Sequence, residues 1–181
     1  MIVVGSVRPV RVGRAVAEWV RATAEVAGGW DIDFVDLRDL ALPFMDEPNH
    51  PVLRKYTKQH TLDWSSRVDA ADAFIFVSPE YNHSFSPALK NALDFLIEEW
   101  WRKPYGVVSY GGISGGTRGI SALEPVLVQL GMLRASAEVE LPFVATQVDD
   151  GVFTANERQQ AILDKQLVEL AGMAEALKPL R

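Results

Sequence analysis

The feature that most constrains the fold is an uninterrupted apolar run at residues 73–77, Ala-Phe-Ile-Phe-Val. A strand that is apolar at every position is buried on both faces, as in the centre of a parallel sheet that helices cover on each side. Parallel neighbours must be joined by crossover connections, which are usually helices. The run therefore predicts a chain in which strands and helices alternate.

The remaining segments follow this alternation. Short apolar or alternating segments predict four further strands, at residues 2–4, 30–35, 105–110 and 137–141. Apolar residues at helical spacing predict helices at about residues 13–27, 52–70, 87–101, 120–130 and 154–177. Ser86 before Pro87 is expected to cap the third helix, and Thr154 with Glu157 the last. The sequence thus predicts a single α/β domain over residues 1–181, with a five-stranded parallel sheet between two layers of helices.

Composition narrows the classes of function. The 181 residues include no cysteine, which rules out disulfides, thiolate metal sites and cysteine nucleophiles and fits a cytoplasmic protein. A net charge of −6 argues against a nucleic-acid surface, because phosphate backbones are bound by broad basic patches. No apolar stretch reaches the roughly 18 residues of a membrane helix. The three histidines, His50, His60 and His83, are too widely spaced to predict a metal site.

In open parallel sheets, ligands bind beyond the carboxyl ends of the strands, which directs attention to three loops. The first loop, residues 5–14, places a serine, three arginines and a helix N-terminus in one turn. Free amides at the helix start, the Ser6 hydroxyl and the Arg8 guanidinium are all suited to a phosphate. This loop predicts an anion site, and a solvated basic turn is the alternative.

The second and third loops have other properties. Residues 78–82, Ser-Pro-Glu-Tyr-Asn, supply a rigid proline, a flat ring and hydrogen-bonding groups, which suit a planar heteroaromatic ligand. Four of the six residues at 111–116 are glycines, whose missing side chains let backbone amides approach a ligand closely. A polar turn and simple flexibility are the respective alternatives.

Three segments carry a resemblance to a known family: GSVRPVRVGR at 5–14, SPEYNHSFSPALKNALD at 78–94 and SYGGISGG at 109–116. They resemble the NADPH-dependent FMN reductases, flavodoxin-like flavoproteins that include quinone, azo-dye and chromate reductases. The segments occur in the family's order, and the resemblance covers nearly the whole chain.

The resemblance implies a flavodoxin-like three-layer sandwich with FMN as cofactor and NADPH or NADH as electron donor. The implied reaction is ping-pong hydride transfer from NAD(P)H to FMN and on to a small acceptor, such as a quinone, an azo compound, a metal oxyanion or free flavin. The flavin performs the chemistry, so no catalytic side chain is expected. A homodimer or homotetramer is also implied.

The resemblance also assigns residues to the cofactor. The FMN phosphate is expected at Ser6 and Arg8, with the amides of Val12, Gly13 and Arg14. The isoalloxazine ring is expected to lie against the second loop, at Pro79, Glu80, Tyr81 and Asn82, largely through main-chain contacts for the first three. Its other edge is expected to border the third loop, at Ser109, Tyr110, Gly111 and Gly112. Arg11 stands where many members have a serine, and is expected either to take over phosphate binding or to face the phosphates of the nicotinamide cofactor. Phe85 and Ser86 also depart from the family, which implies a differently shaped acceptor pocket.

Other interpretations are weaker or stay open. Residues 112–116 match the Gly-x-Ser-x-Gly elbow of serine hydrolases, but that fold places its histidine after the serine, and all three histidines precede Ser114. The glycine fingerprint of Rossmann domains and the phosphate-loop lysine of ATPases are absent. A flavodoxin-like electron carrier without NAD(P)H turnover remains the alternative. Trp100 and Trp101 are equally compatible with the core and with a subunit interface.

Overall fold

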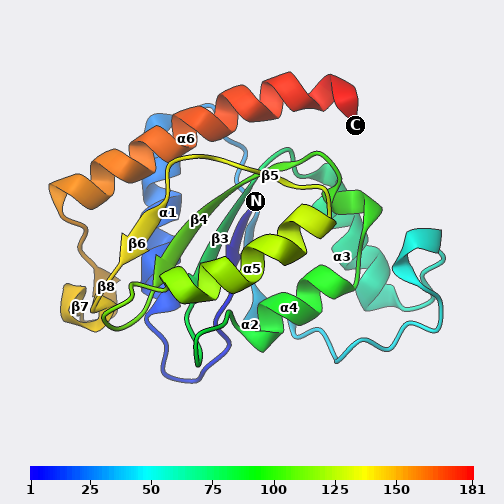
Figure 1. Cartoon of the computed structure of the whole chain (residues 1–181), viewed down its shortest axis with the longest axis horizontal. Coiled ribbons are helices and arrows are strands. Elements are labelled where there is room, and N and C mark those ends of the chain that lie inside the picture. The colour runs from blue at the N-terminus through cyan, green and yellow to red at the C-terminus, as the bar shows by residue number, and fades with distance from the viewer.

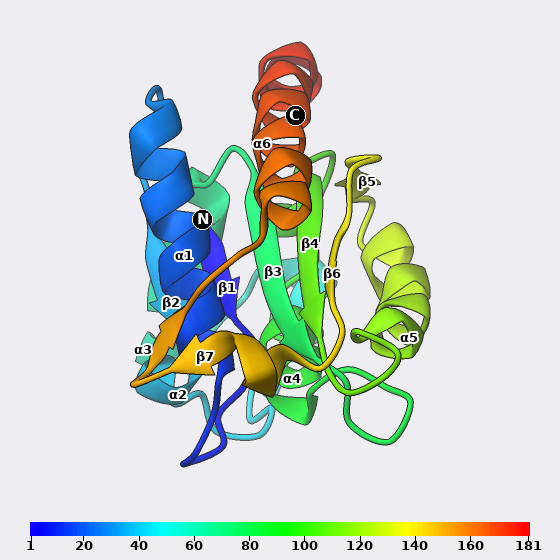
Figure 2. The same ribbon diagram turned by 90° about the vertical axis from the view of Figure 1, so that its left-hand side faces the viewer.

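The computed structural model describes all of residues 1–181 and has three layers (Figures 1 and 2). The central sheet has the order β2-β1-β3-β4, and every pair in it is parallel. The edge beyond β4 is occupied by β5, which pairs with the start of β4, and by β6, which pairs with its end. The strands are β1 (Ile2–Val4), β2 (Phe34–Asp36), β3 (Phe74–Pro79), β4 (Pro104–Tyr110), β5 (Leu133–Arg134) and β6 (Val139–Leu141). The predicted parallel sheet is confirmed, but its fifth, edge strand is divided: β6 matches the strand expected at 137–141, whereas β5 lies in a segment where no strand was expected. The strand expected at 30–35 begins only at Phe34.

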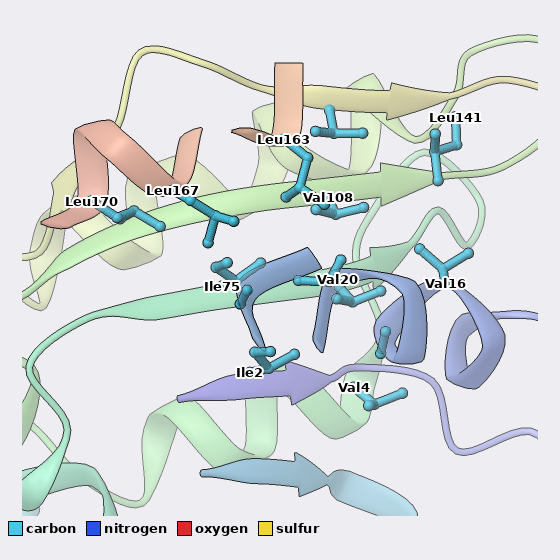
Figure 3. Packing of buried hydrophobic residues seen from close by; sticks show 14 of the residues in the cluster. Ile2, Val4, Val16, Val20, Ile75, Val108, Leu141, Leu163, Leu167 and Leu170 are labelled. Atoms are coloured by element: carbon cyan, nitrogen blue, oxygen red, sulfur yellow. The ribbon is translucent and has the colours of Figure 1, made fainter. Parts of the chain in front are cut away.

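Helices cover both faces of this sheet. Helices α1 (Gly13–Ala27) and α6 (Glu157–Leu177) pack on one face, and α3 (Gln59–Ala70), α4 (Pro87–Asp94) and α5 (Thr117–Gln129) on the other. Alternate residues of β3 enter the two cores, Ile75 beside α1 and α6 and Phe74 on the opposite side. Figure 3 shows the first core, in which side chains from the sheet meet those of α1 and α6. All residues of β3 are buried, as the apolar run at 73–77 predicts, and all residues of β4 are buried as well.

Several helix boundaries differ from those expected. The expected helix at 52–70 begins only at Gln59, because the Glu47 carboxylate accepts hydrogen bonds from the amides of Thr57 and Lys58 and holds the preceding segment in a loop. A short 3₁₀ turn at Pro51–Leu53 precedes it. Helix α4 ends at Asp94, and a separate 3₁₀ turn, Glu98–Trp100, follows. This break lets the Trp100 side chain pack into the core, while Trp101 is half exposed.

The helix caps test the expected capping residues. The Ser86 side chain accepts a hydrogen bond from the amide of Leu89, as expected for the cap of α4. The expected pair of Thr154 and Glu157 is wrong, because α6 is capped by Asn156 and Gln159 in a reciprocal capping box. The amide of Thr154 instead bonds the carbonyl of Gln147, next to the small hairpin of β7 (Val148–Asp149) and β8 (Val152–Phe153). That bond keeps Thr154 outside the helix.

The parallel sheet gathers three loops at one edge. Because β1, β3 and β4 run in the same direction, the loops that follow them emerge together, below the sheet in Figure 2. Ser86 helps to hold them, since its hydroxyl donates to the carbonyl of Gly5 at 2.5 Å. None of the helices is long and apolar enough to cross a membrane.

Candidate functional site

Direct hydrogen bonds join the three loops. The hydroxyls of Ser6 and Tyr81 lie 2.8 Å apart, which links the first loop to the second. The amide of Glu80 donates to the carbonyl of Tyr110 at 3.2 Å, which links the second to the third. Residues that are more than seventy positions apart in the sequence, such as Ser6 and Tyr81, thus belong to one site.

The first loop ends at a helix N-terminus that has no cap. Val12 stands at the N-cap position and offers no side-chain acceptor, and the first turn of α1 contains no acidic residue. The amides of Gly13, Arg14 and Ala15 donate to no acceptor in the protein. Such amides carry the positive end of the helix dipole, so they are suited to an anion.

A buried hydroxyl lies against the same helix start. The side chain of Tyr110 reaches Gly13, where a Cβ atom would come within 2.1 Å of the Tyr110 hydroxyl oxygen. This hydroxyl is buried and has no hydrogen-bond partner in the protein, an arrangement that is costly unless a ligand supplies one. Burial raises the pKa of Tyr110 by more than the nearby Ser6 hydroxyl lowers it, so the hydroxyl stays protonated and available as a donor.

The three arginines of the first loop have different surroundings. Arg11 donates from Nη1 and Nη2 to the two carboxylate oxygens of Asp36, at 2.7 and 2.6 Å. Arg14 contacts the same carboxylate at 3.0 Å and also pairs with Glu18. Arg8 is exposed and makes no ion pair. Of the three, Arg8 alone has a guanidinium free for a ligand.

Asp36 lies beside the candidate site, and the sequence did not point to it. Its side chain, 2% exposed, lies at the end of β2, pairs with Arg11 and also caps the short helix α2 (Leu37–Leu40) through the amide of Arg38. Arg11 was expected to bind the flavin phosphate or to face the phosphates of the nicotinamide cofactor, and the pair with Asp36 was not expected. An acid at the carboxyl end of the neighbouring strand was the available signal, but only the strand order β2-β1 places it beside the first loop.

The second loop forms a tight turn. Tyr81 and Ser84 exchange two backbone hydrogen bonds, and the two residues between them, Asn82 and His83, have φ values of 50° and 67°. Positive φ at both central positions is typical of a type I′ turn, which Asn tolerates well. The turn leaves Asn82 exposed at its tip and Pro79 buried at the end of β3.

The third loop presents a row of unused donors. Its carbonyls at Gly111 and Gly112 accept hydrogen bonds from the amides of Val144 and Phe143. The amides of Gly112, Ile113 and Ser114 have no acceptor in the protein. A Cβ atom added to Gly112 would meet nothing within 4 Å, so open space lies beside it. The loop is therefore held from behind and leaves free donors on its other side.

The side chains of two residues expected at the cofactor site, Ser109 and Glu80, are bound to other groups of the protein. The Ser109 hydroxyl is buried and donates to the carbonyl of Gly115 at 2.9 Å. The Glu80 carboxylate is paired with Arg118 and accepts a hydrogen bond from Ser114. Ser114 and Arg118 were not expected to take part in the site. The Ser114 hydroxyl faces a carboxylate, which is unlike the serine–histidine pair of a hydrolase.

Comparison with known proteins identifies the family. Residues 1–146 match the model of the NADPH-dependent FMN reductases. An NAD(P)H:quinone oxidoreductase of Solanum tuberosum is 34% identical over 164 residues, which cover 83% of this chain and 77% of that protein. The chain belongs to the NADPH-dependent FMN reductase family. An NAD(P)H-dependent FMN reductase of Schizosaccharomyces pombe is 42% identical over 118 residues, 64% of this chain, and the aligned part spans only 59% of that relative.

A solved structure supports the fold. FerB of Paracoccus denitrificans, a flavoenzyme NAD(P)H:(acceptor) oxidoreductase, superposes with a TM-score of 0.74 at 22% identity, covering 95% of this chain and 96% of that one. The likeness confirms the expected flavodoxin-like fold. Membership of the family confirms the expected use of FMN and NAD(P)H.

The residues present in this FMN reductase fit its cofactor. The partnerless hydroxyl of Tyr110 and the uncapped start of α1 match a phosphate, which accepts several hydrogen bonds. The free amides of residues 112–114, beside open space at Gly112, match the polar edge of a flat ring.

We expect Asp36→Ala to destabilise the protein by about 3 kcal/mol, because it leaves the Arg11 guanidinium, only 10% exposed, without its partner. Urea unfolding of the two forms measures this difference. Asp39→Ala is the matched control, since Asp39 is exposed and lies 3.7 Å from Arg14, and we expect it to change stability by less than about 0.5 kcal/mol. Equal effects of the two substitutions would contradict a supporting role of the Arg11–Asp36 pair.

Proposed function

We propose that this chain is a reductase that holds FMN in the site formed by the three loops and passes electrons from NAD(P)H to a small acceptor such as a quinone. The observation that carries the proposal is the buried, partnerless hydroxyl of Tyr110 at the uncapped start of α1. Its placement beside a row of free amides supports a ligand that combines a phosphate with a flat polar ring.

The proposed phosphate subsite uses donors of the first loop and of β4. Ser6, Arg8, Tyr110 and the free amides of residues 13–15 would hold the phosphate. Arg11 supports this subsite from behind through its pair with Asp36 and through its hydrogen bond to the carbonyl of Ser6. A hydrogen bond to a charged phosphate would offset the free-energy cost of burying the Tyr110 hydroxyl, because hydrogen bonds to ionised acceptors are stronger than those between neutral groups.

The proposed ring subsite lies between the second and third loops. Pro79, Tyr81 and Asn82 would border the ring on one side, and the amides of Gly112, Ile113 and Ser114 would donate to its polar edge. When bound, FMN supplies the redox chemistry, accepting a hydride from NAD(P)H and passing electrons to the acceptor. The free amides of the third loop would stabilise negative charge at the polar edge of the reduced ring.

The acceptor is proposed to be a small oxidised molecule. The quinone oxidoreductase of Solanum tuberosum supports quinones as acceptors for this chain. We further propose that residues 1–181 act as one domain and that the protein works in the cytoplasm, to which its cysteine-free composition is suited.

The FMN reductase is also proposed to work as a homodimer or homotetramer. Apolar side chains surround an open groove of about 500 Å³ beside the first loop, where Val7, Leu42, Phe44, Pro87 and Ala88 meet. Phe44 is 85% exposed and continues the apolar surface of this groove, and a contiguous exposed apolar surface is typical of an interaction site. We expect sedimentation velocity to give the mass of an oligomer and Phe44→Asp to shift it towards the monomer. A wild-type protein that sediments as a monomer at micromolar concentration would contradict this assembly.

An anaerobic spectroscopic titration tests the reductase against an electron carrier. We expect the protein with bound FMN to lose its visible flavin absorbance on addition of NADPH and to regain it on addition of a quinone. Bound flavin that does not respond to NADPH or NADH would favour the carrier. Absence of FMN binding would refute both functions.

Two substitutions test the phosphate subsite. We expect Tyr110→Phe to weaken FMN binding about tenfold or more, because a hydrogen bond to a charged group is lost, without destabilising the apoprotein, where the hydroxyl has no partner. Arg8→Ala should also weaken binding, with little effect on stability since Arg8 is exposed. Fluorescence titration of the apoprotein with FMN and urea unfolding measure both quantities. Loss of stability in Tyr110→Phe with unchanged FMN affinity would mean that the hydroxyl serves the fold instead.

A further inference from the structure

The side chain of Glu80 leaves its own loop and reaches the N-terminus of α5. Its Oε1 atom accepts from Nε and Nη2 of Arg118 at 2.7 and 2.6 Å. Its Oε2 atom lies 2.8 Å from the Ser114 hydroxyl, which donates to it. The side chain is only 7% exposed, although it carries a charge and belongs to a surface loop. Burying a carboxylate costs free energy unless its oxygens are paired and hydrogen-bonded.

Glu80 also replaces the missing cap of α5. Gly116 is the N-cap residue of this helix and has no side chain with which to cap it. The amides of Arg118 and Gly119, in the first turn, donate to Oε2 of Glu80 at 3.2 and 3.4 Å. A carboxylate at a helix N-terminus is also favoured by the helix dipole. The cap of α5 therefore comes from a residue that lies 38 positions earlier in the chain.

Gly119 lets α5 approach the second loop closely enough for these bonds. A Cβ atom at Gly119 would lie 3.0 Å from the carbonyl oxygen of Ser84 and 3.4 Å from Cα of Glu80. The first turn of the helix thus rests on the backbone of the turn at residues 81–84. The two elements pack together without a side chain between them.

The charge of Glu80 is maintained in this position. Burial tends to raise its pKa, but the hydrogen bonds from Ser114 and Arg118 outweigh burial, and the pKa lies below its usual value. The carboxylate is therefore ionised at neutral pH and acts only as an acceptor. All of the groups around it are donors, so the contact is consistent in charge and in hydrogen bonding.

We propose that Glu80 is a positioning residue of the flavin site, whose carboxylate fastens the second loop to Ser114 and to the first turn of α5. The proposal rests on the proposed function and deepens it. The free amides of residues 112–114 lie on the segment that Glu80 holds at Ser114 and that Val144 and Phe143 hold at Gly111 and Gly112. With both ends fixed, these donors are oriented before FMN binds, and binding does not have to order them.

Amide hydrogen exchange of the apoprotein tests the fastening itself, because it needs no flavin. Glu80→Gln keeps the size of the side chain but replaces one acceptor oxygen by an amide donor, which faces either the Arg118 guanidinium or the first-turn amides of α5. Glu80→Ala removes every contact. We expect the amides of Gly115, Gly116, Arg118 and Gly119 to exchange at least tenfold faster in both variants. Asp33→Asn is the control, because it weakens another bidentate carboxylate–arginine pair, with Arg67 before β2, at the opposite edge of the sheet, where Asp33 is 40% exposed.

FMN affinity and the visible spectrum of the bound flavin test the positioning role. We expect Glu80→Ala to raise the FMN dissociation constant at least tenfold and to change the shape of the flavin absorbance band, and Glu80→Gln to have a smaller effect in the same direction. Asp33→Asn should leave both unchanged. A role confined to stability would lower the melting temperature of the Glu80 variants without changing either quantity.

The outcomes separate this inference from the proposed function. Faster exchange together with weaker FMN binding in the Glu80 variants supports the inference. If wild-type protein binds FMN and the Glu80 variants bind it with equal affinity, the inference is refuted and the proposed function stands. Exchange at wild-type rates in Glu80→Ala also refutes it. If the wild-type protein binds no FMN, the proposed function fails, and the positioning role fails with it.

Discussion

The two-sided burial of β3 and β4 is the constraint on which the rest of the structure depends. Every residue of these strands is buried, with alternate side chains in two separate cores. Both faces must be covered by helices, so each connection has to cross over the sheet and the strands run parallel. The carboxyl ends of β1, β3 and β4 then lie at one edge, and the loops that follow them lie together there, as the candidate site (Figure 1).

The polar groups at this edge fall into two sets. One set is satisfied within the protein and joins the loops, through contacts such as Ser6 with Tyr81 and Ser86 with Gly5. The other set has no partner: the hydroxyl of Tyr110, the amides at the start of α1 and those of residues 112–114. Within this set the Tyr110 hydroxyl is buried, and buried polar groups are nearly always paired in folded proteins, whereas residues 112 and 113 are exposed. The buried hydroxyl is therefore the stronger sign of a ligand, in line with the proposed phosphate subsite.

Acidic side chains decide which basic groups remain free. Asp36, from the end of β2, occupies Arg11 and part of Arg14, and leaves Arg8 unpaired in the first loop. Glu80, from the second loop, occupies Arg118 and the first turn of α5. The positive end of the α5 dipole is therefore neutralised by Glu80, whereas the positive end of the α1 dipole, at the first loop, remains free. This difference favours the first loop for the anionic part of a ligand.

The sequence by itself determined the fold class, the position of α1 and the cap of α4, and it pointed to the three loops of the candidate site, because these follow from local periodicity, capping chemistry and the order of motifs. It did not determine the cap of α6, the end of α4 or the division of the fifth strand, where competing local bonds such as those of Thr154 and Trp100 decide the boundary. Nor did it determine the partners of Arg11 and Glu80. Those partners, Asp36 and Arg118, are 25 and 38 positions away, and only the strand order and the packing of α5 bring them into contact. Long-range ion pairs leave no periodic pattern in a sequence, so the tertiary structure alone decides which charges are used and which are left for a ligand.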